Sequence, residues 1–240
     1  MTGEQDNECC GTYASPPCYM HEVDPAYVGL VDPQQRTDVM RWRKAERERL
    51  LKQRLAIPSE IRRQRDILIS GHLEQAIGDA AGLAVGIYWP LPSDPDLGGL
   101  LQRLAARGAR IALPVIMGPD EPLIFRTRTI DQGGPCDIPR PADEAEVELS
   151  DVVIAAALGF DPWCHRLGTG NGCLDRTLAA LPKRPRTFAV GYSEAAMATI
   201  YPQPYDIPMD SVVTEDGVIS GPSVVDDDGR VNSREPRARP

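Results

Sequence analysis

The feature that most limits the fold of this 240-residue chain is an alternation of short apolar runs with helix-like segments. The apolar runs typical of strands cover residues 83–90, 110–116, 123–130, 151–160 and 186–192. A helix-like segment at 96–108 separates the first two runs and is long enough for a right-handed crossover between parallel strands. The run DVVIAAALGF at 151–160 is apolar enough for a buried central strand. The alternation therefore predicts an α/β fold.

Helices are expected on both sides of these strands. Residues 37–56 contain no Gly or Pro and offer Thr37 or Asp38 as an N-cap, and residues 59–77 form a second helical segment. Apolar residues of this second segment fall near helical spacing, at Ile61, Leu68, Ile69 and Leu73. Further along, we expect a helix at 173–181, a short helix at 193–200 and a hairpin at 211–220 that turns at Asp216 and Gly217.

Composition divides the chain into three parts. Residues 1–38 and 226–240 are rich in Gly, Pro or charge with little periodicity, which predicts disordered tails around a single domain at 39–225. Three cysteines and a histidine in the first tail could alternatively bind zinc, but they lack a C-x-x-C spacing: Cys9, Cys10, Cys18 and His21. The six cysteines show no disulfide-framework spacing, so we expect free thiols.

Net charge argues against one class of partner. A formal charge of −9 disfavours nucleic-acid binding, which needs a basic surface. No apolar run approaches the roughly 20 residues that cross a membrane, and the first residues do not resemble a secretory signal. We therefore expect a cytoplasmic protein that binds neither nucleic acid nor membranes, and that is a monomer or at most a weak dimer.

A glycine-rich loop follows the predicted central strand. The stretch RLGTGNGCLD, residues 166–175, leads from that strand towards a helix, where backbone N–H groups can bind an anion in α/β proteins. Its spacing is G-x-G-x-G, so it matches neither the dinucleotide motif G-x-G-x-x-G nor the P-loop. By itself the loop is as compatible with a structural turn as with a phosphate site.

Charged residues beside the loop favour a phosphate. Arg166 precedes the first glycine, where it could bind phosphate, and Asp175 lies in the first helical turn, where it could bind Mg²⁺. The alternative is a local salt bridge between the two. In the first helix, Arg43 and Arg47 share a face that could also contact phosphate, although such charge runs usually face solvent. Near the end of the chain, either Asp206 or Asp210 could be a second metal ligand or a turn residue.

These segments together resemble the 5-formyltetrahydrofolate cyclo-ligase family. The family hallmark resembles A-F-D-x-x-G-x-R-L-G-x-G-x-G-Y-Y-D-R, and this chain has GFDPWCHRLGTGNGCLDR. The basic helix, the segment beginning IYWPLPSDPDLGG and the segment YPQPYDIPMDSVVTEDGVI match in the same order. The resemblance covers roughly residues 42–219. It implies a three-layer, open and mostly parallel sheet with helices on both faces, a Rossmann-like fold of the NagB/RpiA/CoA-transferase type.

The resemblance also implies an activity. Family members use ATP and Mg²⁺ to phosphorylate the formyl oxygen of 5-formyltetrahydrofolate, after which N10 attacks, phosphate leaves and 5,10-methenyltetrahydrofolate forms. Arg166 and Asp175 would be catalytic, and Asp175 and Asp206 would bind the metal. The implied ATP contacts are Arg43, Lys44, Arg47, Arg166, Leu167, Gly168, Thr169, Gly170, Asn171, Gly172, Cys173, Leu174 and Asp175. The implied folate contacts are Trp89, Asp94, Gly170, Gly172 and Cys173.

Several positions depart from the family pattern. Asp94 replaces a glutamate, Cys173 and Leu174 replace two tyrosines, Cys164 replaces a glycine, and Arg43 replaces a lysine. These changes affect the folate side more than the phosphate side. Two alternatives to an active cyclo-ligase therefore stay open: a weakened family member that binds folate or nucleotide, and a phosphotransferase acting on another small molecule.

Overall fold

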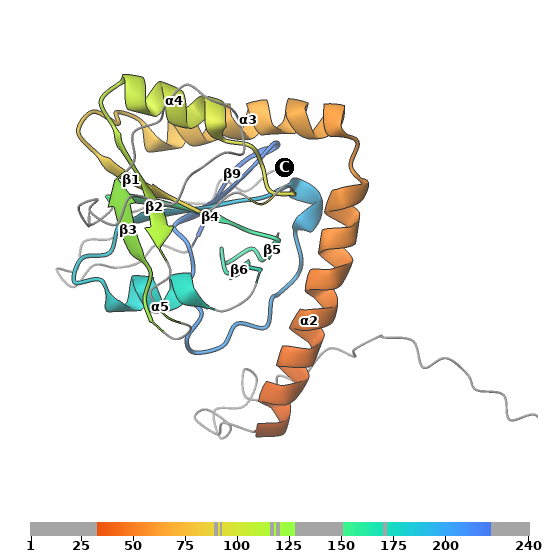
Figure 1. Cartoon of the computed structure of the whole chain (residues 1–240). Coiled ribbons are helices and arrows are strands. Elements are labelled where there is room, and N and C mark those ends of the chain that lie inside the picture. The colour runs from red at the N-terminus through yellow and green to blue at the C-terminus, as the bar shows by residue number, and fades with distance from the viewer. Residues whose placement is uncertain are drawn as a thin grey trace, which may run out of the picture. The chain divides into compact units, whose positions relative to one another are not determined.

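The computed structural model describes residues 33–88, 91, 93–115, 118, 121–127, 151–169 and 172–221. Trp89, Gly170 and Asn171 of the predicted site lie outside the described residues, as do most of the two expected tails. The chain divides into two compact units, residues 1–49 and 50–240, and each is described by itself. The domain boundaries expected at residues 39 and 225 stay a prediction. Helices and strands carry the labels of Figure 1.

Helix α2 spans Pro33–Ala56. It begins four residues before the Thr37 expected from the sequence, so the last residues assigned to the tail form its first turns. Proline suits the first helical position because its missing N–H would have no intrahelical partner there. Arg41 pairs with Asp38 across one turn at 2.6 Å, which adds support on the helix surface.

Within the described residues of the second unit, seven strands form one sheet in the order β3-β2-β1-β4-β7-β8-β9. Their bounds are β1 Ala84–Ile87, β2 Arg110–Val115, β3 Ile124–Thr127, β4 Val152–Ala156, β7 Arg186–Val190, β8 Ser211–Thr214 and β9 Gly217–Ser220. Neighbours from β2 to β8 are parallel, and β3 and β9 add antiparallel edges. The predicted open, mostly parallel sheet and the hairpin β8–β9 are confirmed.

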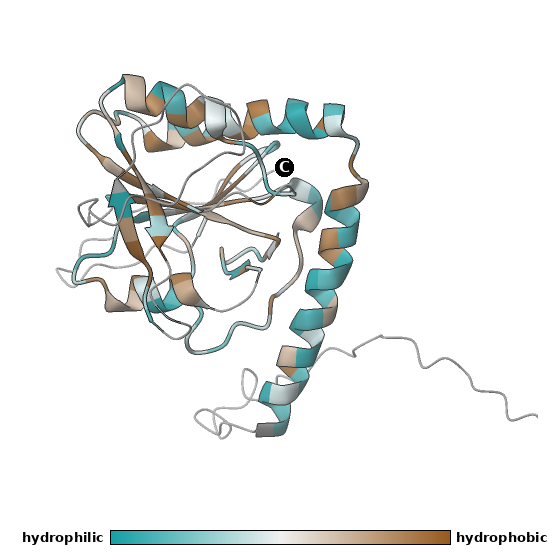
Figure 2. Ribbon diagram, viewed as in Figure 1, coloured by the Kyte–Doolittle hydropathy of each residue, from teal (hydrophilic) through white to brown (hydrophobic). Residues whose placement is uncertain are grey.

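Helices cover both faces of this sheet (Figure 1). Helices α3 (Ser59–Ile77) and α4 (Gly98–Ala106) pack on one face, and α5 (Cys173–Ala180) packs on the other. Because side chains alternate along a strand, Val152 and Ile154 of β4 join the core under α3 and α4, whereas Ala155 joins the core on the side of α5. Figure 2 shows the hydrophobic colour of these central strands.

Helix α3 has the predicted bounds. Ile69, Leu73 and Ile77 are buried at intervals of four residues, whereas Ile61 and Leu68 are exposed. Of the four apolar residues near helical spacing, only Ile69 and Leu73 therefore belong to the buried face, which continues to Ile77. Among the described residues, no helix combines the length and hydropathy needed to span a membrane.

Two predicted elements differ in the structure. The apolar run 151–160 is interrupted after Ala156, and Gly159–Phe160 form a separate strand β5, antiparallel to β6 (Arg166–Leu167) inside the glycine loop. The helix predicted at 193–200 is reduced to one 3₁₀ turn, η2 (Ser193–Ala195). The reason is a competing backbone bond: the Met197 N–H donates to the Phe160 carbonyl at 2.9 Å, and Ala196 bridges to β5.

Cys164 makes the turn between β5 and β6 with a left-handed backbone, φ 64°. Glycine is the residue most at ease there, because a Cβ makes this conformation costly. The side chain is fully buried, and burial raises the pKa of its thiol to about 12. The thiol therefore stays protonated and serves as a packing group.

The backbone of Cys164 predicts an unusual order of stability between two variants. Both Cys164→Ala and Cys164→Gly remove the sulfur, but only alanine keeps a Cβ at positive φ. At ordinary positions glycine is about 1 kcal/mol less stable than alanine. We expect that deficit to vanish here, so that urea unfolding shows Cys164→Gly to be at least as stable as Cys164→Ala. A deficit of about 1 kcal/mol would show that the turn carries no such cost.

Candidate functional site

The order of the strands marks one edge of the sheet as the place for a ligand. The chain passes from β1 to β2 in one direction and from β4 to β7 in the other, so the direction reverses between β1 and β4. Open α/β sheets bind ligands outside the carboxyl ends of their strands at such a reversal. The segments that follow β1, β4 and β7 therefore form the candidate site.

The glycine loop delivers an open helix end. Gly172 precedes α5 with φ 63°, a conformation that glycine accepts readily, and no side chain among the described residues caps the first turn of the helix. The N–H groups of that turn are therefore available to an anion, and the helix dipole favours negative charge there. Cys173 and Leu174 are the first residues of this helix and are half-buried.

Arg166 and Asp175 meet across the loop. An Arg166 Nη2 donates to Asp175 Oδ2 at 2.9 Å, and the side chains are 9% and 12% exposed. The second oxygen, Asp175 Oδ1, accepts the Ile207 N–H at 3.2 Å. The salt bridge foreseen as the structural alternative is thus present. Among the described residues, Arg166 Nε is buried without a hydrogen-bond partner, which leaves one strong donor unused.

The first glycine of the loop makes room for this arginine. A Cβ built on Gly168 would lie 2.5 Å from Arg166 Nη1, too close for any side chain unless the guanidinium moves. The residues on either side of Gly168 differ in burial. Leu167 is buried in the core, so only its backbone faces the loop, whereas Thr169 is exposed. Leu174 packs against the apolar core on this side of the sheet.

Asp206 lies next to the segment that binds Asp175. Its Oδ2 accepts the Gln203 N–H at 2.6 Å in a short turn, and the following residue, Ile207, donates to Asp175. The described part of the chain contains no group of three or more side chains able to hold a metal. Mg²⁺ nevertheless needs only one or two carboxylates when phosphates and waters complete its shell, and a carboxylate oxygen has more than one lone pair. The two aspartates fit that donor set.

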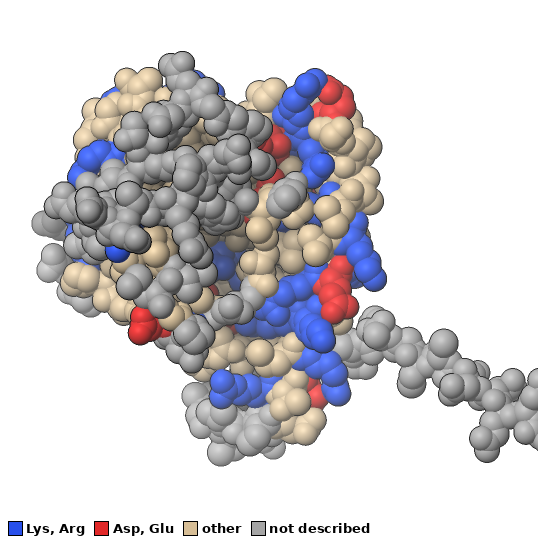
Figure 3. Space-filling view, viewed as in Figure 1, with Lys and Arg blue, Asp and Glu red and all other residues tan. Residues whose placement is uncertain are grey.

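The basic residues predicted to contact ATP lie on α2. Figure 3 shows Lys and Arg side chains along this helix. Arg43, Lys44 and Arg47 belong to the first unit, residues 1–49, whereas the glycine loop belongs to the second. Their approach to the loop therefore stays a prediction. Arg43 is 4% exposed, which departs from the solvated face typical of a charge run.

Asp94 has a partner that the sequence did not suggest. Arg54 Nη1 donates to Asp94 Oδ1 at 2.8 Å, and the two side chains are only 3% and 2% exposed. Burial raises the pKa of the Asp94 carboxyl, while the Leu91 N–H and Arg54 act in the opposite direction, and burial lowers the pKa of Arg54. Removing one member of such a pair costs about 3–5 kcal/mol. This ion pair is the main site feature that the sequence analysis missed.

A signal for Arg54 was present in the spacing. Arg54 lies four residues after Leu50, so the two share one face of α2, and Ile57 follows just beyond the end of the helix. Leu50 is buried and Ile57 is partly buried. An arginine on an apolar helix face indicates a buried partner of opposite charge. The sequence analysis grouped Arg54 with the other cations of this helix and therefore did not single it out.

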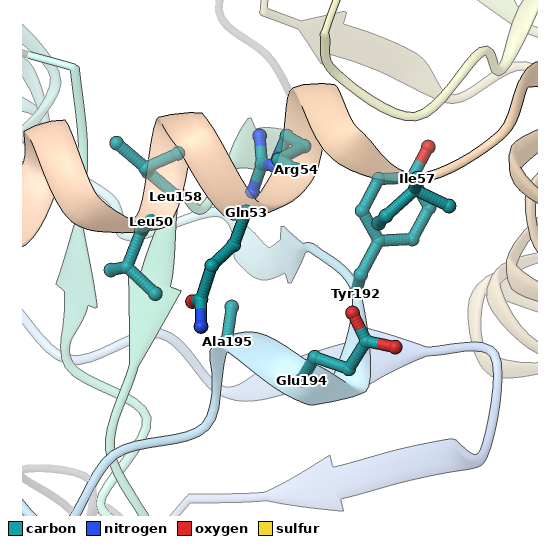
Figure 4. Close-up of a pocket in the computed structure, with 8 residues that line it drawn as sticks. All are labelled: Leu50, Gln53, Arg54, Ile57, Leu158, Tyr192, Glu194 and Ala195. Carbon is teal, nitrogen blue, oxygen red and sulfur yellow. The ribbon is translucent and has the colours of Figure 1, made fainter.

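A small hollow adjoins the ion pair. Eight residues line it: Leu50, Gln53, Arg54, Ile57, Leu158, Tyr192, Glu194 and Ala195. Figure 4 shows Gln53 and Arg54 on α2, with Tyr192, Glu194 and Ala195 on the segment after β7. Its cavity volume is only about 10 Å³, far below the roughly 300–1,000 Å³ of a ligand pocket. A folate or nucleotide needs more room than this hollow offers.

Asp161 organises the turn that presents Arg166. Its Oδ1 accepts the N–H groups of Trp163 and His165, both at 3.0 Å, and the residue is 1% exposed. His165 Nδ1 also lies 3.5 Å from this carboxylate. The sequence shows Asp161 within the matched segment GFD, but its part in building the turn is visible only in the structure.

Comparison with known proteins agrees with this architecture. A family model described as the 5-formyltetrahydrofolate cyclo-ligase family matches residues 39–215. A 5-formyltetrahydrofolate cyclo-ligase of Mycolicibacterium smegmatis is 31% identical over 178 residues, which cover 70% of this chain and 91% of that protein.

Two solved structures share the fold. One is a 5,10-methenyltetrahydrofolate synthetase from Mycoplasma pneumoniae, with a TM-score of 0.61 at 19% identity, covering 72% of this chain and 98% of the other. The second is the 5,10-methenyltetrahydrofolate synthetase of Aquifex aeolicus, with a TM-score of 0.61 at 22% identity, covering 76% and 95%. At these identities they establish the fold, and the family match establishes the relationship. The chain belongs to the 5-formyltetrahydrofolate cyclo-ligase family.

Proposed function

We propose that this chain converts 5-formyltetrahydrofolate to 5,10-methenyltetrahydrofolate and releases ADP and phosphate from ATP. The observation that carries the proposal is the Arg166–Asp175 pair, set at the open N-terminus of α5 in a chain of this family. A cation, free backbone donors and a carboxylate are what phosphoryl transfer needs, because its catalysis is mostly positioning and charge neutralisation.

Each residue of the loop has a separate task in this proposal. Arg166 uses its free Nε to bind a phosphate oxygen, and the first-turn N–H groups of α5 bind another. Gly168 leaves the space in which the guanidinium lies. Arg43, Lys44 and Arg47 are the second set of phosphate-binding cations. The backbone from Leu167 to Leu174 lines the phosphate path, including Thr169, Gly170, Asn171, Gly172 and Cys173.

Asp175 and Asp206 are the proposed ligands of Mg²⁺. The ion supplies positive charge against the phosphates of ATP when it is bound. The Ile207 N–H holds Asp175 in place at 3.2 Å, so the two carboxylates come from segments that are tied together. Arg166 keeps Asp175 neutralised in the structure described here.

On the folate side, Asp94, Trp89 and Cys173 are the proposed contacts, with Gly170 and Gly172 close to the substrate. A carboxylate such as Asp94 can accept the paired N–H groups of a pterin ring. The proposed cell compartment is the cytoplasm, and the free thiols of Cys164 and Cys173 suit a reducing environment. We also propose that the protein acts as a monomer.

A second function is favoured by one observation. Arg54 occupies the carboxylate of Asp94, and that carboxylate is the proposed anchor of the pterin. A folate that binds weakly would be turned over slowly. The second candidate is therefore a weakened family member that binds folate or nucleotide without efficient turnover.

The proposal is tested by following the near-ultraviolet absorbance of the methenyl product. We expect product formation that requires the protein, ATP, Mg²⁺ and 5-formyltetrahydrofolate together. ATP consumption that 5-formyltetrahydrofolate does not stimulate would instead favour a phosphotransferase with another substrate. Folate binding by calorimetry with no product at high protein concentration would select the second candidate.

Loss of the Arg166 guanidinium should weaken ATP binding. Hydrogen bonds to charged groups contribute about 1.5–3 kcal/mol, so Arg166→Met should raise the Kd for ATP roughly tenfold to a hundredfold, measured by calorimetry. Arg103→Met is the matched control, because Arg103 lies on α4, on the opposite face of the sheet, and pairs with Glu74. Equal Kd values in the two variants would contradict the phosphate role.

Restoring the tyrosines of the family pattern tests the weakened folate side. In the double variant Cys173→Tyr with Leu174→Tyr, we expect the KM for 5-formyltetrahydrofolate to fall by roughly tenfold to thirtyfold, because aromatic rings add contact area worth about 1 kcal/mol each. Leu174→Tyr alone separates a ligand contact from packing, since Leu174 already touches the core. If only the stability changes and the KM does not, position 174 belongs to the core.

A further inference from the structure

The buried ion pair Arg54–Asp94 occupies the point where a ligand is expected. Asp94 follows β1, and Ala157 follows β4, the two strands between which the sheet reverses direction. Arg54 bonds to both: one Nη donates to Asp94 Oδ1 at 2.8 Å, and the other donates to the Ala157 carbonyl. The guanidinium therefore spans the carboxyl ends of β1 and β4, where this class of fold places its ligands.

Both oxygens of Asp94 have partners inside the chain. Oδ1 accepts from Arg54, and Oδ2 accepts the Leu91 N–H at 3.1 Å. A pterin ring presents its 2-amino group and the adjacent ring N–H as two parallel donors, the same pattern that a guanidinium presents to a carboxylate. Arg54 gives Asp94 one such hydrogen bond and directs its other Nη to Ala157, so Arg54 and a pterin would compete as donors for Asp94 Oδ1.

We infer that Arg54 is a specificity-determining residue that occupies the pterin-anchoring carboxylate from within the chain, so that a folate binds only by taking Asp94 from Arg54. The inference rests on the proposed function, because it takes Asp94 as the folate-contacting carboxylate. It accounts for the burial of the proposed folate-contacting carboxylate, since the Arg54 and Asp94 side chains are 3% and 2% exposed.

The surroundings give the displaced guanidinium another position. The Arg54 side chain lies 5.6 Å from the centre of the Tyr192 ring and forms part of the wall of the small hollow (Figure 4). Glu194 lines the same hollow, and its Oε1 accepts from Arg65 at 2.7 Å. A guanidinium released from Asp94 therefore keeps the Tyr192 ring as its main partner, in a favourable cation–π contact. Asp94 would then face the site without a competing donor.

The decisive experiment compares the full-length protein with Arg54→Met and Arg186→Met. Methionine keeps an unbranched apolar stem and removes the guanidinium. Arg186 is the matched control: it also lies over an aromatic ring, Phe188 at 5.4 Å, and bonds to backbone carbonyls, but it stands at the start of β7, at the end of the strand away from the candidate site. The Kd of 5-formyltetrahydrofolate and the Kd of ATP are measured by calorimetry in the same buffer for all three proteins.

We expect Arg54→Met to bind 5-formyltetrahydrofolate at least about tenfold more tightly than the unchanged protein, because the competition for Asp94 is removed. The Kd of ATP should not change, and Arg186→Met should match the unchanged protein for both ligands. If Arg54→Met is not stable enough to measure, Arg54→Lys replaces the guanidinium, which bonds to Asp94 and to Ala157 at once, with a single ammonium group. That variant should tighten folate binding by several-fold.

Two results separate the failure of this inference from the failure of the proposed function. If the unchanged protein binds 5-formyltetrahydrofolate and the Arg54 variants bind it equally or more weakly, the competition does not exist and the inference is overturned. If neither the unchanged protein nor any Arg54 variant binds the folate, the proposed function itself is overturned, and the inference falls with it.

Discussion

The parallel pairing of β1 with β4 is the constraint on which the rest of the second unit depends. The register joins Val85 to Val152 and Ile87 to Ile154, and the sheet then grows in opposite directions from this pair. Because successive side chains point to opposite faces, one register sets which residues meet α3 and α4 and which meet the opposite core. It also brings the segments after β1 and β4 to the same edge, where polar groups from distant parts of the chain can meet.

Two ion pairs near this edge of the sheet differ in their burial and in their separation along the sequence. Arg166–Asp175 is local in sequence, somewhat less buried at 9% and 12% exposure, and retains an unused donor among the described residues, as suits a site that receives an anion. Arg54–Asp94 joins residues forty positions apart, is almost fully buried, and has both carboxylate oxygens taken. Breaking a buried pair of this kind costs more than breaking an exposed one, because the remaining charge has no water to replace its partner. In the proposed site, the phosphate side therefore keeps a donor for a ligand, whereas the carboxylate proposed to contact folate is bonded within the chain.

Much of the site could be predicted because its residues are adjacent in the sequence. Arg166, Gly168, Gly172 and Asp175 lie within ten positions, and the helix that follows them fixes their relation by its own geometry. Cys164 was identified as a residue at a glycine position, and its φ of 64° confirms that the turn needs the conformation for which glycine is suited. The predictions that were wrong, the helix at 193–200 and the unbroken strand at 151–160, failed at segments whose backbone bonds to a distant partner.

The sequence by itself determined the α/β architecture, the order of strands and helices and the membership of the family, since these follow from hydrophobic periodicity and from motifs carried by contiguous residues. Only the tertiary structure decided that Asp94 pairs with Arg54 and that both side chains are buried. The physical reason is that a charge on a helix is stable in water or beside an opposite charge, and local sequence cannot distinguish the two. The sheet decides between them by placing the end of α2 against the carboxyl ends of β1 and β4, where a guanidinium and a carboxylate neutralise each other.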